Sequence, residues 1–177
     1  MKIQDNQLGF LFDLDQTLVD SRICAKNRKM RNWPTVYSMI PLIKIYPGIQ
    51  ELFQTISDFD NKICIITSSP SSYCLRVIAH FQLKVDATVC YHDTSLHKPN
   101  SEPINEGLRR LRIKSSKAYS IGDATQDIIA SKSAGVISIA ALWGSDDSNS
   151  LIGSNPDYIC KSVEELQKYC EKLMNLN

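Results

Sequence analysis

The 177-residue sequence has no hydrophobic run long enough to cross a bilayer, and the apolar stretch near its start is too short for a signal peptide. It also has no internal repeat and no low-complexity segment. With 43% hydrophobic and 22% charged residues, the composition is not that of a disordered chain. We therefore expect a single cytoplasmic domain over residues 1–177 that buries a substantial core.

Cysteine motifs for metal binding or redox chemistry are absent as well. The six cysteines form none of the CxxC pairs that zinc and dithiol sites need, so we expect reduced thiols with structural roles. The net charge of +1 gives no general argument for a nucleic acid or a membrane as partner. The charge is unevenly spread, however, because residues 20–46 hold six basic residues and one acid, a formal +5.

The chain alternates between short apolar runs of strand length and segments with helical periodicity. The apolar runs lie at residues 8–12, 62–67, 87–92, 117–122, 136–142 and 157–160. Helical patterns follow at 71–82, 102–113 and 162–174, with Ser71 as an N-cap, Pro103 in a first turn and Gly135 after a helix end. This alternation predicts a three-layer α/β/α, Rossmann-like domain whose mainly parallel sheet is covered on both faces.

Polar side chains follow four of these apolar runs, at the points where strands should end. In an open parallel sheet, ligands bind beyond the carboxyl ends of the strands, so these side chains should converge on one rim. Several carboxylates, hydroxyls and one lysine suit a hard divalent cation and a phosphate. The residues are Asp13 and Asp15, then Thr67 and Ser68, then Lys98, then Asp123 and Asp127.

Asp13 and Asp15 pose a particular question, because residues two apart in a strand point to the same face. The two carboxylates would then repel each other unless the backbone turns there or a cation lies between them. A magnesium ion would offset this repulsion. An aspartate can also attack phosphorus and form an aspartyl-phosphate, which splits one difficult hydrolysis into two easier steps.

Four segments of the sequence resemble, in the same order, the four motifs of the haloacid dehalogenase (HAD) superfamily of phosphotransferases. They are "DLDQT", "IITSS", "HKPNSEP" and "GDATQD", and the resemblance extends from residue 8 to about residue 142. Four motifs in order at strand ends are far more specific than any one of them. The resemblance implies a HAD-like fold, Mg²⁺ as cofactor and catalysis at the strand ends, and we expect the strand order 3-2-1-4-5.

The resemblance also implies roles for the individual residues. Asp13 corresponds to the nucleophile and a magnesium ligand. Asp15 corresponds to the acid/base that protonates the leaving oxygen and later activates water, and to a metal ligand through its backbone carbonyl. Thr67 and Lys98 correspond to the positions that bind the phosphate group.

The fourth motif supplies two further acids, and three positions differ from the family pattern. Asp123 corresponds to a metal ligand, and Asp127 to a second acid that reaches the metal directly or through water. Gln16 replaces a common glycine without altering the carboxylates. Ser68 stands where asparagine is frequent, which leaves open which side chain completes the phosphate site. Ser101 replaces the second proline of a KPxP pattern.

Residues 20–46 interrupt the alternation of strands and helices directly after the first strand. The resemblance implies that this basic segment is a small helical cap over the site, much shorter than usual, which suggests an open site. Its basic residues 22–31, with Trp33 and Tyr37 nearby, are typical of a surface that binds nucleotides or nucleic acids. The alternative is a solvated helix face with Trp33 packed inward.

These observations favour a magnesium-dependent phosphatase that hydrolyses a phosphomonoester through an aspartyl-phosphate. A dehalogenase would lack an acid at Asp15, and a phosphomutase of the same superfamily would need a full cap to exclude water. A signalling receiver domain has its motifs in another order, and a domain that only binds phosphorylated partners would not need the complete set. The expected partner is a phosphorylated small molecule, with a nucleotide or nucleic-acid end as the alternative; no membrane partner is expected, and the oligomeric state stays open.

Overall fold

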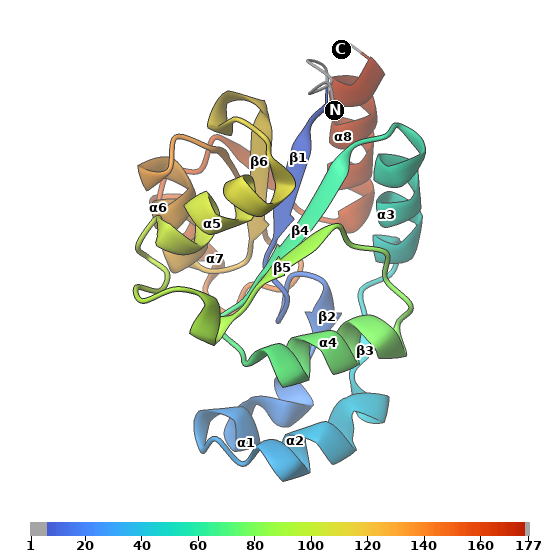
Figure 1. Ribbon diagram of the computed structural model, residues 1–177, viewed down its shortest axis with the longest axis vertical. Coiled ribbons are helices and arrows are strands. Elements are labelled where there is room, and N and C mark those ends of the chain that lie inside the picture. Colours follow the sequence, from blue (N-terminus) through green and yellow to red (C-terminus); the bar gives the residue numbers. More distant parts are fainter. Residues whose placement is uncertain (1–6, 176–177) are drawn as a thin grey trace.

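The computed structural model describes residues 7–175 and contains a six-stranded sheet with helices on both faces (Figure 1). Every neighbouring pair of strands in this sheet is parallel, and the order is β5-β4-β1-β6-β7-β8. This confirms the predicted fold class and the order 3-2-1-4-5, with the sixth strand at the edge. The strands are β1 (Gly9–Phe12), β4 (Lys62–Ile66), β5 (Ala87–Val89), β6 (Ala118–Gly122), β7 (Ile137–Ala141) and β8 (Tyr158–Cys160).

Strand β1 shows why both faces of the sheet are covered. Phe10 and Phe12 point into the larger core cluster and Leu11 into the second one, as the alternation of a strand requires. Burial of each of these side chains stabilises the fold by about 2 kcal/mol. The first face carries α3 (Ile49–Asp58), α4 (Ser71–His80) and α8 (Val163–Asn175), and the second carries α5 (Glu102–Leu111) and α6 (Thr125–Ser133), with α7 (Ser148–Gly153) beside α6 (Figure 1).

The helix boundaries follow the predicted residues in two cases and differ in a third. Pro103 lies in the first turn of α5, and Gly135 follows α6 with a φ of 68°. Ser71 was predicted as an N-cap, but this is wrong: Pro70 is the N-cap and Ser71 the first helical residue. Pro70 has an extended backbone, with ψ of 152°, and its carbonyl oxygen accepts the first helical bond, so the helix begins one residue after it.

The third apolar run gives a shorter strand than its length suggested, because β5 ends at Val89. Tyr91–Asp93 forms the 3-10 turn η3 instead. The backbone N–H of Cys90 donates to the Asp93 carboxylate at 2.7 Å, which fixes this turn. Another 3-10 turn, η4 (Ser115–Lys117), precedes β6.

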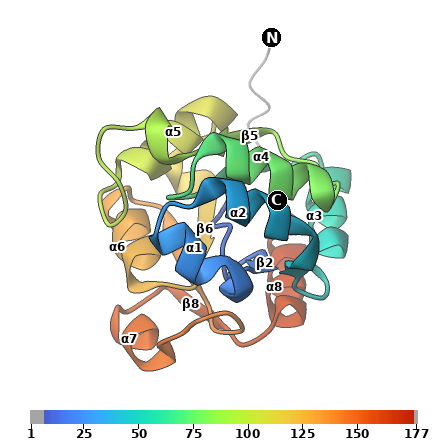
Figure 2. The ribbon, with the colours of Figure 1, turned by 90° about the horizontal axis from the view of Figure 1, so that it is seen from below.

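The basic segment 20–46, here called the cap segment, lies beyond the carboxyl ends of the strands (Figures 1 and 2). Its base is a short antiparallel pair of β2 (Val19–Asp20) and β3 (Lys44–Ile45). Between these strands lie η1 (Arg22–Cys24), α1 (Ala25–Lys29), α2 (Trp33–Met39) and η2 (Ile40–Leu42).

The cap segment packs its apolar side chains against the rest of the molecule. Val36 and Ile40 are buried in the larger core cluster, and α2 lies against α4. Trp33 is partly buried, with its ring 6.0 Å from the ring of Tyr73, so the inward packing of Trp33 is confirmed. The hydroxyl groups of Tyr37 and Ser72 lie 2.6 Å apart and share a hydrogen bond between α2 and α4.

None of the helices within residues 7–175 is both long and apolar enough to span a membrane. All six cysteines are buried and carry free thiols, in agreement with the structural role expected for them.

Candidate active site

A cleft of about 540 Å³ lies between the carboxyl ends of the strands and the cap segment. Its lining includes residues from all four predicted motifs and also Ala25, Arg28 and Lys29 of helix α1. Figure 2 shows α1 beyond the ends of the strands. The predicted residues Asp13, Asp15, Thr67, Ser68, Lys98, Asp123 and Asp127 all border this cleft.

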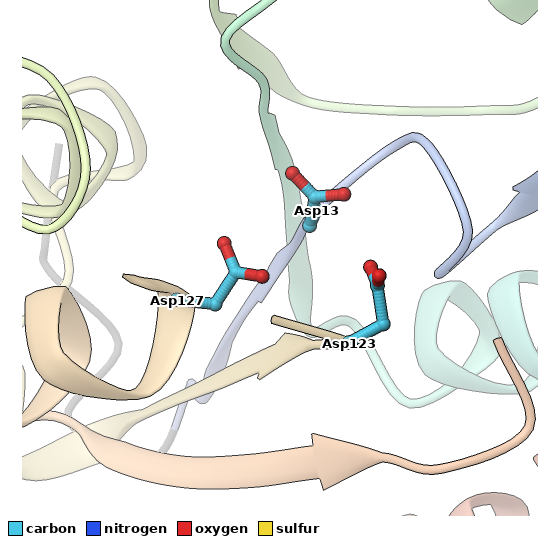
Figure 3. Close-up of side chains that lie close together, drawn as sticks. All are labelled: Asp13, Asp123 and Asp127. Carbon is cyan, nitrogen blue, oxygen red and sulfur yellow. The ribbon is translucent and has the colours of Figure 1, made fainter. Parts of the chain in front are cut away.

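Three carboxylates converge at the base of the cleft (Figure 3). Asp13 follows β1, Asp123 follows β6, and Asp127 lies in the first turn of α6. One carboxylate oxygen from each lies within 4.8 Å of the other two. Three carboxylate oxygens in this arrangement form a donor set that fits a hard divalent cation such as Mg²⁺.

Neighbouring groups hold these carboxylates in place. The Thr17 hydroxyl donates to Asp123 at 2.7 Å, and the backbone N–H of Ala124 donates to Asp127 at 3.1 Å. Asp127 therefore stabilises the N-terminus of α6 with one oxygen while the other faces the cleft. Gly122 is required here, because a side-chain carbon at this position would lie 2.3 Å from Cβ of Asp127.

Lys98 extends from the third motif into the same cluster, and its side chain is only 7% exposed. The ammonium group donates to Asp13 and to Asp127, both at 2.7 Å, and to the carbonyl oxygen of Ile66 at 2.8 Å. Lys98 thus supplies one positive charge between two acids that would otherwise repel each other.

Burial raises the pKa of Asp13 well above its usual value; the Lys98 ammonium opposes this shift, and the nearby Asp127 and Asp123 carboxylates add to it. Burial, together with the charge of Asp127, raises the pKa of Asp123 to about 7. For Lys98, burial acts to lower the pKa, but Asp127 and Asp13 outweigh it and hold the pKa above its ordinary value. Burial first, and then the neighbouring carboxylates, disfavour the ionised forms of Asp13 and Asp123, and a bound divalent cation would offset both effects.

Asp15 lies apart from the three clustered carboxylates. Strand β1 ends at Phe12 and the backbone turns, so that the N–H of Leu18 donates to the carbonyl oxygen of Leu14. The side chains of Asp13 and Asp15 consequently have separate partners, and the turn removes the repulsion that a continued strand would impose. The Asp15 side chain is not among the clustered oxygens, which leaves its backbone carbonyl as the predicted ligand atom.

Four side chains surround the Asp15 carboxylate. The hydroxyls of Ser21 and Tyr73 donate to one of its oxygens at 2.6 and 2.8 Å, and the Ser69 hydroxyl donates to the other at 3.0 Å. The Arg28 guanidinium forms an ion pair with it from helix α1. The cap segment therefore contacts the predicted acid/base directly.

The pKa shifts of the residues around Asp15 agree with these contacts. Burial raises the pKa of the Tyr73 hydroxyl, and the negative charge of Asp15 raises it further, so Tyr73 stays protonated and donates its hydrogen bond. Burial acts to lower the pKa of Arg28, but the charge of Asp15 more than compensates. Arg28 also donates to the Ser21 hydroxyl at 2.6 Å, which links these partners into one network.

Thr67 and Ser68, the predicted phosphate-binding residues after β4, differ in exposure. Thr67 is buried, and its hydroxyl accepts the backbone N–H of Ser69 at 3.1 Å. Ser68 is exposed on the side of the cleft. Ser69, which was not predicted as a site residue, is the member of this run that contacts Asp15.

The partners of Asp15 are the main residues that the sequence did not reveal. Tyr73 lies 58 residues away from Asp15 in the chain, and no motif connects the two. Arg28 was recognised only as one of several basic residues in the cap segment. Gln16 did carry a signal: it replaces a common glycine, and its φ of 70° shows the left-handed backbone that glycine adopts without strain.

Comparison with known proteins agrees with this geometry. The sequence matches the haloacid dehalogenase-like hydrolase family over residues 22–141, a span that begins after Asp15 and includes Lys98 and Asp123. A phosphoglycolate phosphatase from Vibrio parahaemolyticus is 26% identical over 144 residues, which are 80% of this chain and 63% of that protein. The pyrophosphatase PpaX from Halalkalibacterium halodurans is 26% identical over 127 residues, 71% of this chain and 59% of that protein.

The chain thus spans about three fifths of the length of these relatives. Solved structures show the same fold at low sequence identity. A predicted phosphoglycolate phosphatase from Haemophilus somnus has a TM-score of 0.82 at 15% identity, covering 94% of this chain and 99% of that one. A HAD-superfamily hydrolase of subfamily IA from Geobacter sulfurreducens has a TM-score of 0.72 at 17% identity, covering 92% and 99%. Fold and family match together show that the chain belongs to the haloacid dehalogenase-like hydrolase family.

Proposed function

We propose that the protein is a magnesium-dependent phosphatase that hydrolyses a phosphomonoester in two steps through an aspartyl-phosphate. One observation carries this proposal: Asp13 lies in a cation-compatible group with Asp123, Asp127 and Lys98, while Asp15 is held separately by three hydroxyls and Arg28. Two aspartates in such different surroundings are suited to two different roles. The division into a catalytic part and the cap segment belongs to the same proposal.

In the first step, Asp13 attacks the phosphorus atom. A bond forms between its carboxylate oxygen and phosphorus, and the bond from phosphorus to the ester oxygen breaks. Asp15 gives its proton to the departing oxygen, which leaves as an alcohol. The network around Asp15 keeps its carboxyl group at the position where this proton is needed.

In the second step, Asp15 accepts a proton from a water molecule, and the resulting hydroxide attacks the phosphorus of the aspartyl-phosphate. The bond to Asp13 breaks, inorganic phosphate leaves, and the carboxylate of Asp13 is restored. Asp15 regains in this step the proton that it gave up in the first, and no further reactant is needed.

The remaining site residues bind the phosphoryl group. The Lys98 ammonium is placed to offset the charge that develops on phosphoryl oxygens, and Thr67 and Ser68 offer hydroxyls at the end of β4. Asp13, Asp123 and Asp127, together with the backbone carbonyl of Asp15, would hold the magnesium ion. When bound, the ion supplies positive charge that orients the phosphoryl group and reduces its repulsion of Asp13.

Pyrophosphate and phosphoglycolate are the first substrates to consider, because they occur in the names of the relatives. Both are phosphorylated small molecules, in line with the expected partner. A phosphomutase is less consistent with the site, because a cap segment of this size leaves the cleft open to water. A domain that only binds phosphorylated partners would have no use for the separate network around Asp15.

Phosphate release from a panel of phosphate esters and pyrophosphate tests this proposal, with Mg²⁺ and with chelator. We expect release that requires Mg²⁺ and that falls at least about 1,000-fold in Asp13→Asn, because the amide is a poor nucleophile. Circular dichroism should show that the variant remains folded. Undiminished release by Asp13→Asn would contradict the nucleophile assignment, and no release from any compound by folded wild type would refute the phosphatase.

A further inference from the structure

The cleft has a second group of charges, on the side formed by the cap segment. Lys29 ends helix α1, and Arg31 lies in the turn before α2; both are exposed and both line the cleft. We call these two residues the cationic wall. They face the same cleft as the carboxylates but belong to a different part of the chain.

The other cations of the cleft have acidic partners, and the cationic wall does not. Lys98 pairs with Asp13 and Asp127, and Arg28 pairs with Asp15. Neither Lys29 nor Arg31 takes part in any ion pair among residues 7–175. Their charges are therefore free to meet an anion that enters the cleft.

The backbone of Arg31 also sets this residue apart. The N–H of Asn32 donates to the carbonyl oxygen of Asn27, and the N–H of Arg31 to that of Arg28, both at 2.9 Å. This is the Schellman arrangement of a helix end, in which the residue at the position of Arg31 has a left-handed backbone and is usually glycine. Arg31 has a φ of 55°, so a long cationic side chain occupies a position where glycine would be less strained.

The cationic wall adds positive charge that the acids of the cleft do not pair with. Lys98 and Arg28 are engaged by Asp13, Asp127 and Asp15, whereas Lys29 and Arg31 add two unpaired positive charges on the side of the cleft that the cap segment forms. The scissile phosphoryl group would bind at the carboxylate cluster, and a cleft of about 540 Å³ has room for a leaving group as well. The part of a substrate that lies next to the cationic wall is then its leaving group.

We propose that Lys29 and Arg31 form a second anion-binding subsite, which selects phosphate esters whose leaving group carries a carboxylate or phosphate of its own. This inference rests on the proposed phosphatase function and deepens it by naming the substrate class. Lys29 and Arg31 are specificity residues in this scheme, whereas Arg28 stays with Asp15.

Matched esters that differ only in the charge of the leaving group provide the test. A short series consists of 2-phosphoglycolate, 2-hydroxyethyl phosphate and phosphoethanolamine, with negative, neutral and positive leaving groups. A longer series consists of phenyl phosphates with a carboxyl, hydroxymethyl or aminomethyl group at the para position. We expect wild type to prefer the anionic over the neutral member of at least one series by about tenfold in kcat/KM.

Charge reversal should invert this preference. In the double variant Lys29→Glu, Arg31→Glu, we expect the ratio of anionic to neutral ester to fall about 100-fold and the cationic ester to become the preferred one. Lys26→Glu is the matched control, because Lys26 is exposed on the same helix but is not part of the cleft lining. This control should keep the wild-type ratio despite its altered net charge.

The outcomes separate the two proposals. If no ester of either series is hydrolysed, the proposed phosphatase function fails. If all esters are hydrolysed but wild type shows no charge preference, or if the double variant slows all members of a series equally, the subsite is refuted and the wall only attracts phosphate in general. Calorimetric titration of each ester into Asp13→Asn, with and without the double substitution, gives the same comparison for binding alone.

Discussion

The carboxylate cluster and the cationic wall line the same cleft, yet they are built in opposite ways. In the cluster, Lys98 is 7% exposed and pairs with two acids, and three distant parts of the chain meet. In the wall, two exposed cations come from neighbouring positions in one short segment and have no acidic partner within the described chain. Charges that fixed ion pairs hold in place suit a fixed chemical step, whereas exposed and unpaired cations suit the capture of an anionic ligand.

The largest effect should come from the cluster. In Lys98→Met, two buried carboxylates lose their shared cation, and we expect turnover to fall about 1,000-fold and the free energy of unfolding to fall by about 3 kcal/mol. Millimolar Mg²⁺ should recover part of that stability, since the ion offsets the same repulsion. Kinetics and chemical denaturation with and without Mg²⁺ measure both effects.

Lys168→Met is the control for this substitution, because Lys168 forms an exposed pair with Glu164 on α8. It should leave turnover unchanged and show no added stabilisation by Mg²⁺. A Lys98→Met protein that gains no more stability from Mg²⁺ than wild type would argue against a metal at Asp13, Asp123 and Asp127.

Arg28 tests whether catalysis and leaving-group selection depend on separate residues, because it belongs to the cap segment but contacts Asp15. We expect Arg28→Ala to lower kcat by about 10- to 100-fold with anionic and neutral esters alike, since Asp15 loses a positioning partner. Arg28→Lys should recover part of this loss. An effect confined to KM for anionic esters would instead place Arg28 in the cationic wall.

The difference between the regions also explains what could be predicted from the sequence. The carboxylate cluster was predictable, because its residues follow strands whose carboxyl ends must meet at one edge of a parallel sheet. The surroundings of Asp15 were not, because they depend on how α4 and α1 pack. Tyr73 reaches Asp15 from 58 positions away, and Arg28 looks like its basic neighbours until the fold shows its partner.

Two predicted boundaries of secondary-structure elements were wrong for a related reason. The apolar run at residues 87–92 suggests a strand of that length, but β5 ends at Val89 because Tyr91–Asp93 forms the turn η3. Ser71 has the side chain of an N-cap, yet Pro70 before it already has the extended backbone of that position. In both cases a neighbouring element outweighed a correct local preference.

The smallest expected effect is the salt dependence of kcat/KM, which compares the exposed cationic wall with the buried carboxylate cluster. The cationic wall is exposed, and the screening length falls from about 10 Å at 0.1 M salt to about 3 Å at 1 M, so its attraction for an anionic leaving group should weaken. We expect kcat/KM for the preferred anionic ester to fall about threefold to tenfold between low and high salt, with kcat nearly constant because the cluster is buried. The neutral ester should respond less, and neutralising both residues in Lys29→Gln, Arg31→Gln should make the two responses equal. An equal fall in kcat for both esters would mean that salt acts on the carboxylate cluster. Burial would then not protect the chemical step from screening.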